Sequence, residues 1–385
     1  MHRDPHRPTD VPTSSSLPRI TRRHALFGAA ALAAPLAPRF AFADAAAAPA
    51  STGIVILNGN ENPYGPSPAA RQAILASVGN APRYADDNID HLKQLIADRE
   101  GVAPAQVTVG AGSGELLKLC GLVGLLNGPG GELVAARPTY EELPKFADAL
   151  GLKLQWVAPD ARLRHDLDAM RAAVNANTRL VYVCNPNNPT GAAVTRTALT
   201  SFVKSMPAHV LVVVDEAYID FVTEPDVGSV IPLVKDAANL VVLRTFSKIH
   251  GLAGLRIGYG ISSPEIAQRF ARLWLTWPNT TGIDAAVASY GDAAFLKSTR
   301  ETILADRTRV QATLDRMGLP RSEAQGNFVF FDTRGPLKAF QDRMLAQGIK
   351  VGRHFDGFDT WSRTTIGTTA EVDRFLAALP RALTG

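Results

Sequence analysis

Residues 210–218 read VLVVVDEAY and residues 240–248 read LVVLRTFSK, and these two stretches decide the fold. Each contains a near-continuous run of Val and Leu, which is typical of a strand buried on both faces of a sheet. Each run then gives way to polar residues. Because ligands bind beyond the carboxyl ends of strands in parallel α/β sheets, we expect Asp215 and Lys248 to lie at a ligand site.

Short β-rich runs alternate with helical patterns on both sides of these stretches. The expected strand and helix pairs are 106–110 with 115–126, 132–136 with 141–150, 153–157 with 167–174, and 180–184 with 198–204. This alternation predicts an α/β fold with a mostly parallel sheet that helices cover on both faces. We expect residues 81–294 to form this large domain and residues 44–80 and 295–385 to form a smaller α+β domain.

Composition and charge exclude several classes of protein. The chain has 385 residues and is 46% hydrophobic, which is enough for a substantial core. Its net charge of +4 comes from the first 43 residues, because residues 44–385 carry 34 basic and 34 acidic side chains. A balanced body does not predict a nucleic-acid partner. Cys120 and Cys184 lack metal-ligand spacing, so we expect free thiols and no metal site.

Residues 1–43 resemble a twin-arginine signal peptide. Arg22 and Arg23 precede an apolar run at 25–37, and Ala41-Phe42-Ala43 offers a small-residue cleavage site. The run is interrupted by proline and is shorter than the roughly 20 residues that span a bilayer, so we expect no stable membrane anchor. The resemblance implies export to the periplasm or the medium.

A glycine-rich turn predicts a phosphate site. Gly112-Ser113-Gly114 follows a predicted strand and opens a helix, where backbone N–H groups and the helix dipole favour an anion. The turn lacks P-loop spacing, which weighs against a mononucleotide site. Thr245, Ser247 and Arg256 could add donors to the same phosphate monoester.

Lys248 and Asp215 predict a cofactor with an aldehyde and a cationic ring. A lysine after a buried strand is desolvated, which lowers its pKa and allows Schiff-base chemistry. An acid that emerges from an apolar strand needs a cation, and a protonated pyridine nitrogen is one. Tyr218 could place its phenol beside a ring hydroxyl. Taken singly, these residues also suit a surface lysine, a helix cap and a core aromatic.

Four motifs in order carry a family resemblance: 185–191 (NPNNPTG), 215–218 (DEAY), 245–248 (TFSK) and 251–258 (GLAGLRIG). Together they resemble the fold-type I, pyridoxal-phosphate-dependent aminotransferases of class I and II. Residues 57–68 (LNGNENPYGPSP), Arg83-Tyr84 and 138–140 (PTY) are similar to the histidinol-phosphate aminotransferase branch. The resemblance implies a transaminase that moves an amino group between an amino acid or amine, histidinol-phosphate-like or aromatic, and a 2-oxo acid.

The resemblance also implies roles for the residues of the cofactor site. Lys248 is the expected Schiff-base lysine and proton carrier, Asp215 the partner of the ring nitrogen, and Tyr218 the third residue of the catalytic set. Pyridoxal 5'-phosphate is the implied cofactor, and its expected contacts are Ser113, Gly114, Tyr140, Asn188, Asp215, Tyr218, Thr245, Ser247, Lys248 and Arg256.

The substrate side is expected to involve Arg363, Arg353, Tyr84 and Asn327. Arg363 aligns with the arginine that pairs with the substrate carboxylate in this family, and Tyr84 with a tyrosine that reaches the neighbouring subunit's site, which implies a homodimer. The branch places a phosphate-binding arginine directly after a Gly-Ile-x-Val run. Here Gly352 intervenes before Arg353, whose partner is therefore open between a phosphate, a second carboxylate and none.

Two other functions remain open at this point. A fold-type I lyase or decarboxylase uses the same scaffold, and Arg363 suits it equally well. A non-catalytic protein that retains pyridoxal phosphate predicts at least one decayed catalytic position, and the motifs show none.

Overall fold

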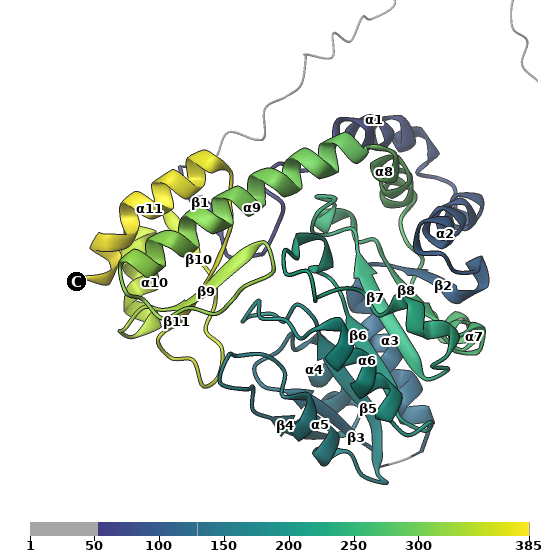
Figure 1. Cartoon of the computed structure of the whole chain (residues 1–385). Coiled ribbons are helices and arrows are strands. Elements are labelled where there is room, and N and C mark those ends of the chain that lie inside the picture. Colours follow the sequence, from purple (N-terminus) through teal and green to yellow (C-terminus); the bar gives the residue numbers. More distant parts are fainter. Residues whose placement is uncertain (1–52, 129, 385) are drawn as a thin grey trace, which may run out of the picture. The chain divides into compact units, whose positions relative to one another are not determined.

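The computed structural model describes residues 53–128 and 130–384, and its largest sheet has seven strands (Figure 1). Strands β3 to β7 run parallel to one another where they pair, whereas β8 is antiparallel to both β2 and β7. The predicted α/β fold with a mostly parallel sheet is therefore confirmed. In spatial order the strands are β2 (Val107–Gly110), β8 (Gly258–Ser262), β7 (Leu240–Thr245), β6 (Leu211–Asp215), β5 (Thr178–Cys184), β3 (Glu132–Ala136) and β4 (Lys153–Val157).

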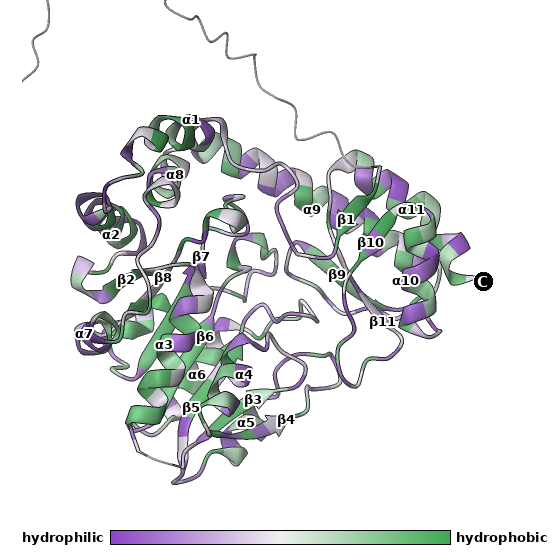
Figure 2. Cartoon of the chain, turned by 180° about the vertical axis from the view of Figure 1, so that it is seen from behind, coloured by the Kyte–Doolittle hydropathy of each residue, from purple (hydrophilic) through white to green (hydrophobic). Residues whose placement is uncertain are grey.

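Alternate residues of the central strands enter two different apolar cores. In β6, Val212 and Val214 join one cluster, whereas Leu211 and Val213 join another on the opposite face. This explains why the sequence of the strand is apolar throughout. The central strands and α3 are correspondingly hydrophobic in Figure 2. The first cluster includes residues of α2 (Asp86–Glu100), α5 (Leu167–Ala173), α6 (Arg196–Ser205) and α8 (Thr280–Gly291), and the second includes residues of α3 (Ser113–Leu126), α4 (Glu142–Ala149) and α7 (Pro264–Arg272).

Local sequence signals explain where several helices begin. Thr195 caps α6 by accepting a hydrogen bond from the Ala198 N–H. Ser263 caps α7 in the same way, and a proline follows it at the first helical position. The carboxyl ends of β3 to β7 lie on one edge of the sheet because these strands pair in parallel.

A third apolar cluster joins the start of the described chain to its last quarter. β1 (Val55–Leu57) pairs in parallel with β10 (Ile349–Val351), and β9 (Phe328–Asp332) pairs antiparallel with β11 (Trp361–Thr365). The helices that pack there are α9 (Ala293–Arg316), α10 (Leu337–Ala346) and α11 (Thr369–Leu383).

One part of the expected arrangement differs. We expected residues 53–78 as a whole to pack with the smaller domain; β1 and Tyr64 do so, but the helix that follows does not. Helix α1 (Pro68–Ser77) packs against α8, and Ala70 lies in the cluster of the large sheet. The segment divides because Ser67 and Pro68 start a new helix after the loop that follows β1. The exact domain boundaries stay a prediction.

The proposed leader at 1–43 lies outside the described residues. Within 53–128 and 130–384, no helix combines the length and the apolar composition that crossing a membrane requires.

Candidate active site

The carboxyl ends of β5, β6 and β7 border a cavity of about 390 Å³. The N-terminus of α3, the segment between β3 and α4, and the loops after β1 and β10 contribute to its wall. Many of the residues predicted from the sequence line it together: Ser113, Gly114, Tyr140, Asn188, Asp215, Tyr218, Thr245, Ser247, Lys248, Arg256, Arg353 and Arg363. The fold therefore gathers side chains that are up to 250 positions apart in the sequence.

Asp215 is the last residue of β6 and is 2% exposed. Its Oδ2 accepts a hydrogen bond from the Tyr182 hydroxyl at 3.2 Å, and its Oδ1 accepts one from the Ala217 N–H at 3.1 Å. Burial raises the pKa of Asp215 to about 6, even though both hydrogen bonds favour the charged form. A bound cation would compensate this buried carboxylate.

Lys248 lies three residues beyond the end of β7. Its Nζ donates to the Gly59 carbonyl at 3.4 Å and lies 5.5 Å from the centre of the Tyr218 ring. Desolvation, followed by the positive charge of Arg363, lowers the pKa of Lys248 to about 8. A substantial neutral fraction therefore exists near pH 8, and the neutral amine is the nucleophilic form.

Sequence reasoning missed two residues, Asn60 and Tyr182, that contact the predicted ones. Below, the group formed by Asp215, Lys248, Tyr218 and Tyr182 is called the floor of the cavity. Asn60 donates from Nδ2 to the Tyr218 hydroxyl at 3.1 Å, beside a second donor, Asn188 Nδ2, at 3.3 Å. Tyr182 lies on β5 and supplies the hydroxyl on Asp215. A phenol within the apolar run of β5 was the available signal for Tyr182, and Asn60 lay within a motif used only for the family resemblance.

The glycine-rich turn and β7 form an anion cradle. Gly112 has φ +81°, and a Cβ there would lie 2.2 Å from Arg256 Nη2, so only glycine fits. Ser113 begins α3 directly after it. Opposite, the Thr245 hydroxyl donates to Ser247 Oγ at 2.9 Å, and Arg256 Nη1 donates to the same oxygen at 3.2 Å. A helix N-terminus, two hydroxyls and a guanidinium together suit a phosphate monoester.

Arg363 lies on β11 and is 8% exposed. Its Nη1 donates to Asn188 Oδ1 at 2.7 Å and its Nη2 to the Asn58 carbonyl at 2.5 Å. Its buried Nε has no hydrogen-bond partner within the described residues. Neutral acceptors alone surround this guanidinium in the contacts above, so its position suits an anionic group of a bound substrate.

The four remaining predicted residues differ in whether they line the cavity. Tyr140 lines the cavity, and burial raises its pKa to about 12. Arg353 lies on the loop after β10. Tyr84 does not line the cavity; it is 80% exposed, and its ring centre lies 5.5 Å from that of Trp277. Asn327 also lies behind the wall, where its Nδ2 donates to the carbonyls of Asn60 and Glu61, both at 3.1 Å.

These groups fit pyridoxal phosphate, the cofactor implied by the sequence. The cradle at Gly112 matches its phosphate, and the buried Asp215 carboxylate matches a protonated ring nitrogen. Tyr218, with its two amide donors, matches a ring hydroxyl or oxyanion. The amine of Lys248, whose pKa is lowered, matches an aldehyde.

Comparison with known proteins agrees with pyridoxal phosphate as the cofactor. The chain is 39% identical to the histidinol-phosphate aminotransferase of Moorella thermoacetica over 85% of its own length and 84% of that protein. It is also 39% identical to histidinol-phosphate aminotransferase 1 of Dechloromonas aromatica, over 86% of this chain and 90% of that one. The solved structure of histidinol-phosphate aminotransferase from Sinorhizobium meliloti, in complex with pyridoxal-5'-phosphate, superimposes with a TM-score of 0.78 at 30% identity, covering 86% and 90% of the two chains.

The family match covers most of the molecule. The family "Aminotransferase class I and II" matches this chain over residues 52–379, which include every strand and helix that contributes to the cavity. The four motifs quoted from the sequence fall inside this range. The chain belongs to the class I and II aminotransferase family.

Proposed function

We propose that this pyridoxal-phosphate-dependent aminotransferase takes a histidinol-phosphate-like or aromatic amine as its amino donor and a 2-oxo acid as its acceptor. The observation that carries the proposal is the pairing of Lys248 and Asp215 in one cavity with opposite pKa shifts. Two titratable groups pushed in opposite directions by one environment are typical of a proton-transfer site.

Asp215 and Lys248 have separate roles in the proposed reaction. Bound pyridoxal phosphate supplies a cationic ring that withdraws the electron pair left when the substrate Cα loses its proton. Asp215 keeps the ring nitrogen protonated, and the Tyr182 hydroxyl favours the ionised form of that carboxylate. Lys248 is near enough to neutrality to accept the Cα proton and return it.

Arg363 on β11 lines the same cavity and holds an anionic group of the substrate. Its guanidinium is anchored by Asn188 and Asn58, so it is fixed before the substrate arrives. A planar two-pronged donor suits either a carboxylate or a phosphate, which is consistent with a donor that carries one and an acceptor that carries the other.

Single-turnover spectroscopy tests this function. The visible absorbance band of the bound cofactor should disappear when the correct donor is added and return when a 2-oxo acid follows. Histidinol phosphate, aromatic amino acids and acidic amino acids should be compared on the purified protein. Product release without this reversible loss of the band would instead identify a lyase or decarboxylase.

A homodimer with shared sites is the expected assembly. Its support is the family resemblance at Tyr84, together with the exposed apolar side chains near it, Trp277 at 48% and Leu275 at 49% exposure. Analytical ultracentrifugation should give a dimer, and Tyr84→Asp should weaken both dimerisation and turnover. A fully active monomer would contradict the shared site.

Export by the twin-arginine route is the expected fate of the chain. Its support is the order of Arg22-Arg23, the apolar run at 25–37 and the Ala41-Phe42-Ala43 site in the sequence. Cell fractionation should find the protein outside the cytoplasm with Asp44 as its first residue. Replacing both arginines by lysine should retain it inside, and correct export of that double variant would exclude this route.

A further inference from the structure

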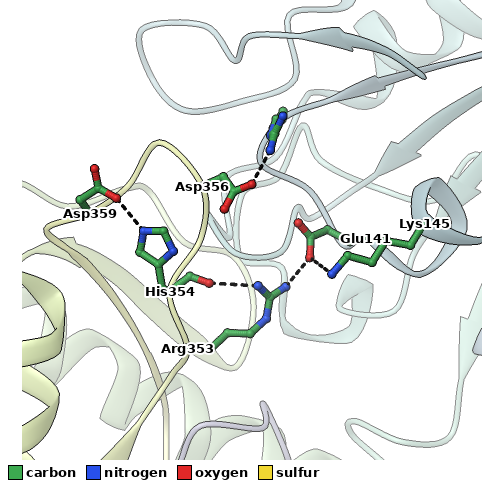
Figure 3. A network of polar contacts seen from close by, with 7 residues as sticks. Glu141, Lys145, Arg353, His354, Asp356 and Asp359 are labelled. Carbon is green, nitrogen blue, oxygen red and sulfur yellow. Dashed lines mark hydrogen bonds and ion pairs between the residues drawn. The ribbon is translucent and has the colours of Figure 1, made fainter. Parts of the chain in front are cut away.

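The mouth of the cavity carries a second arginine whose surroundings differ from those of Arg363 (Figure 3). Arg353 Nη2 donates to Glu141 Oε2 at 2.8 Å, and its Nη1 donates to the His354 carbonyl at 3.0 Å. Its guanidinium carbon lies 4.3 Å from the centre of the Phe355 ring. Because 54% of the Arg353 side chain is exposed, its ion pair with Glu141 is partly hydrated and therefore weak.

Glu141 has a second cationic partner of its own. Lys145, one helical turn further along α4, places Nζ 2.9 Å from the same Oε2 atom that Arg353 contacts. Figure 3 shows both cations converging on this carboxylate. If Arg353 moves to another anion, Glu141 therefore keeps a partner, and no carboxylate is left without a counter-charge.

The loop that carries Arg353 has other attachments. Asp356 accepts a hydrogen bond from Arg137, which precedes Tyr140 in the segment between β3 and α4. His354 Nε2 lies 2.7 Å from Asp359 Oδ1 within the loop (Figure 3). Arg353 can therefore exchange its partner while the loop stays in place.

We propose that Glu141 is a specificity-determining residue that holds Arg353 when the bound substrate has one anionic group and releases it to a second anionic group when there is one. This inference rests on the proposed transaminase function, in which two different substrates use one site in turn. A substrate with a neutral side chain leaves Arg353 on Glu141, so its guanidinium charge stays paired. A substrate whose second anionic group is a carboxylate or a phosphate takes Arg353 over, while Lys145 stays on Glu141.

The exchange lowers the binding affinity only of substrates with a second anionic group, because only these compete with Glu141 for Arg353. Glu141→Gln removes the competing charge. We expect the variant to bind such substrates about fivefold more tightly, the range of an exposed ion pair, and to leave others unchanged. With 2-oxoglutarate, KM should fall by the same factor at constant kcat.

Calorimetry on the purified holoenzyme tests this with non-reacting probes. Glutarate carries a second carboxylate, 3-phosphonopropionate a phosphonate, and butyrate neither. Tighter binding of glutarate or of 3-phosphonopropionate, but not of butyrate, is the expected result for Glu141→Gln, and the probe that gains identifies the second anion. In an Arg353→Gln background the same substitution should have no effect on any probe.

Glu142→Gln is the matched control. Glu142 is the next residue in the chain and pairs with Lys118 at 3.1 Å, away from Arg353. Equal glutarate and 3-phosphonopropionate affinities in the native enzyme and Glu141→Gln, or equal gains from Glu142→Gln, would overturn the inference. The absorbance response to an amino donor is read separately, so loss of transaminase function would be recognised independently of these binding constants.

Discussion

Two groups of residues at the cavity differ in their access to water. The floor is Asp215, Lys248 and Tyr218, which line the cavity, together with Tyr182 behind Asp215. The rim is Arg353, which also lines the cavity, together with Glu141, Lys145 and Asp356 around it. On the floor, burial shifts the pKa of Asp215 up and that of Lys248 down. On the rim, the same kinds of charged group stay partly hydrated, and their ion pairs are exchangeable. The difference teaches that exclusion of water makes groups reactive, whereas access of water lets a charged pair change partners.

Lys248→Ala should produce the largest effect, because the floor depends on this amine for both cofactor attachment and proton transfer. We expect kcat to fall by about 10⁴-fold. Borohydride should no longer attach the cofactor covalently to the protein, as mass spectrometry would show. Lys204→Ala on the exposed face of α6 is the control and should change neither measurement. Undiminished turnover by Lys248→Ala would exclude this residue as the catalytic amine.

Asp215→Asn separates the catalytic role of the floor from its stability. We expect the barrier to rise by about 3 kcal/mol, roughly a hundredfold in kcat, because a neutral ring is a poor electron sink. Without cofactor the variant should be the more stable protein. The folded pKa of about 6 exceeds the ordinary value of 3.8, so native stability falls as pH rises from about 4 to 6 and stays lower above it, by about 3 kcal/mol.

Thermal unfolding of the cofactor-free proteins at pH 4 and pH 8 measures that difference. The variant should unfold at a higher temperature than the native protein at pH 8 and at a similar one at pH 4. A native rate, or equal unfolding temperatures at pH 8, would mean that Asp215 is not the buried charge of the floor.

Tyr182→Phe sharpens the comparison by removing one hydrogen bond from the floor. The hydroxyl favours the charged carboxylate, so its loss should raise the pKa of Asp215 further. A hydrogen bond from a neutral hydroxyl to a charged carboxylate contributes about 1.4 kcal/mol, which corresponds to a pKa shift of about one unit. The acidic limb of the kcat profile should move to higher pH by that amount. An unchanged limb would reduce Tyr182 to a packing role.

Asp356→Asn tests the rim and should have the smallest effect. Its partner Arg137 and the carboxylate itself are both well exposed, so solvent already screens their interaction. We expect the unfolding temperature to change by less than about 1 °C, and kcat to stay within about twofold. A loss of turnover comparable with that of Asp215→Asn would show that the rim is as tightly coupled to the chemistry as the floor.

The regular parts of the fold follow from local pattern. The predicted strands at 132–136, 153–157 and 240–245 coincide with β3, β4 and β7. β3 and β7 consist mostly of apolar residues, whereas β4 reads KLQWV and mixes polar with apolar residues. β8 was not predicted. It reads GYGIS, a short run with two glycines, and is stabilised by antiparallel pairing with both β2 and β7 rather than by its own propensity.

The site was predictable where residues follow strand ends and less so where contacts cross between elements. Asp215 and Lys248 end apolar runs, so their location was visible in the sequence. Tyr182 reaches Asp215 only because β5 and β6 are neighbours, which a single strand does not reveal. The Nδ2 of Asn327 holds the backbone of Asn60 and Glu61, a contact between distant segments that the sequence does not reveal, and its contact with substrate stays a prediction.

Because β1 pairs with β10, the substrate site can be completed only late in synthesis of the chain. The second strand of this pair is made almost 300 residues after the first, and Arg363 emerges later still. Until then Asn60 also lacks Thr365, to whose hydroxyl its backbone N–H donates at 2.9 Å. A nascent chain can assemble the large sheet early, but it gains a closed substrate site only when synthesis is nearly finished.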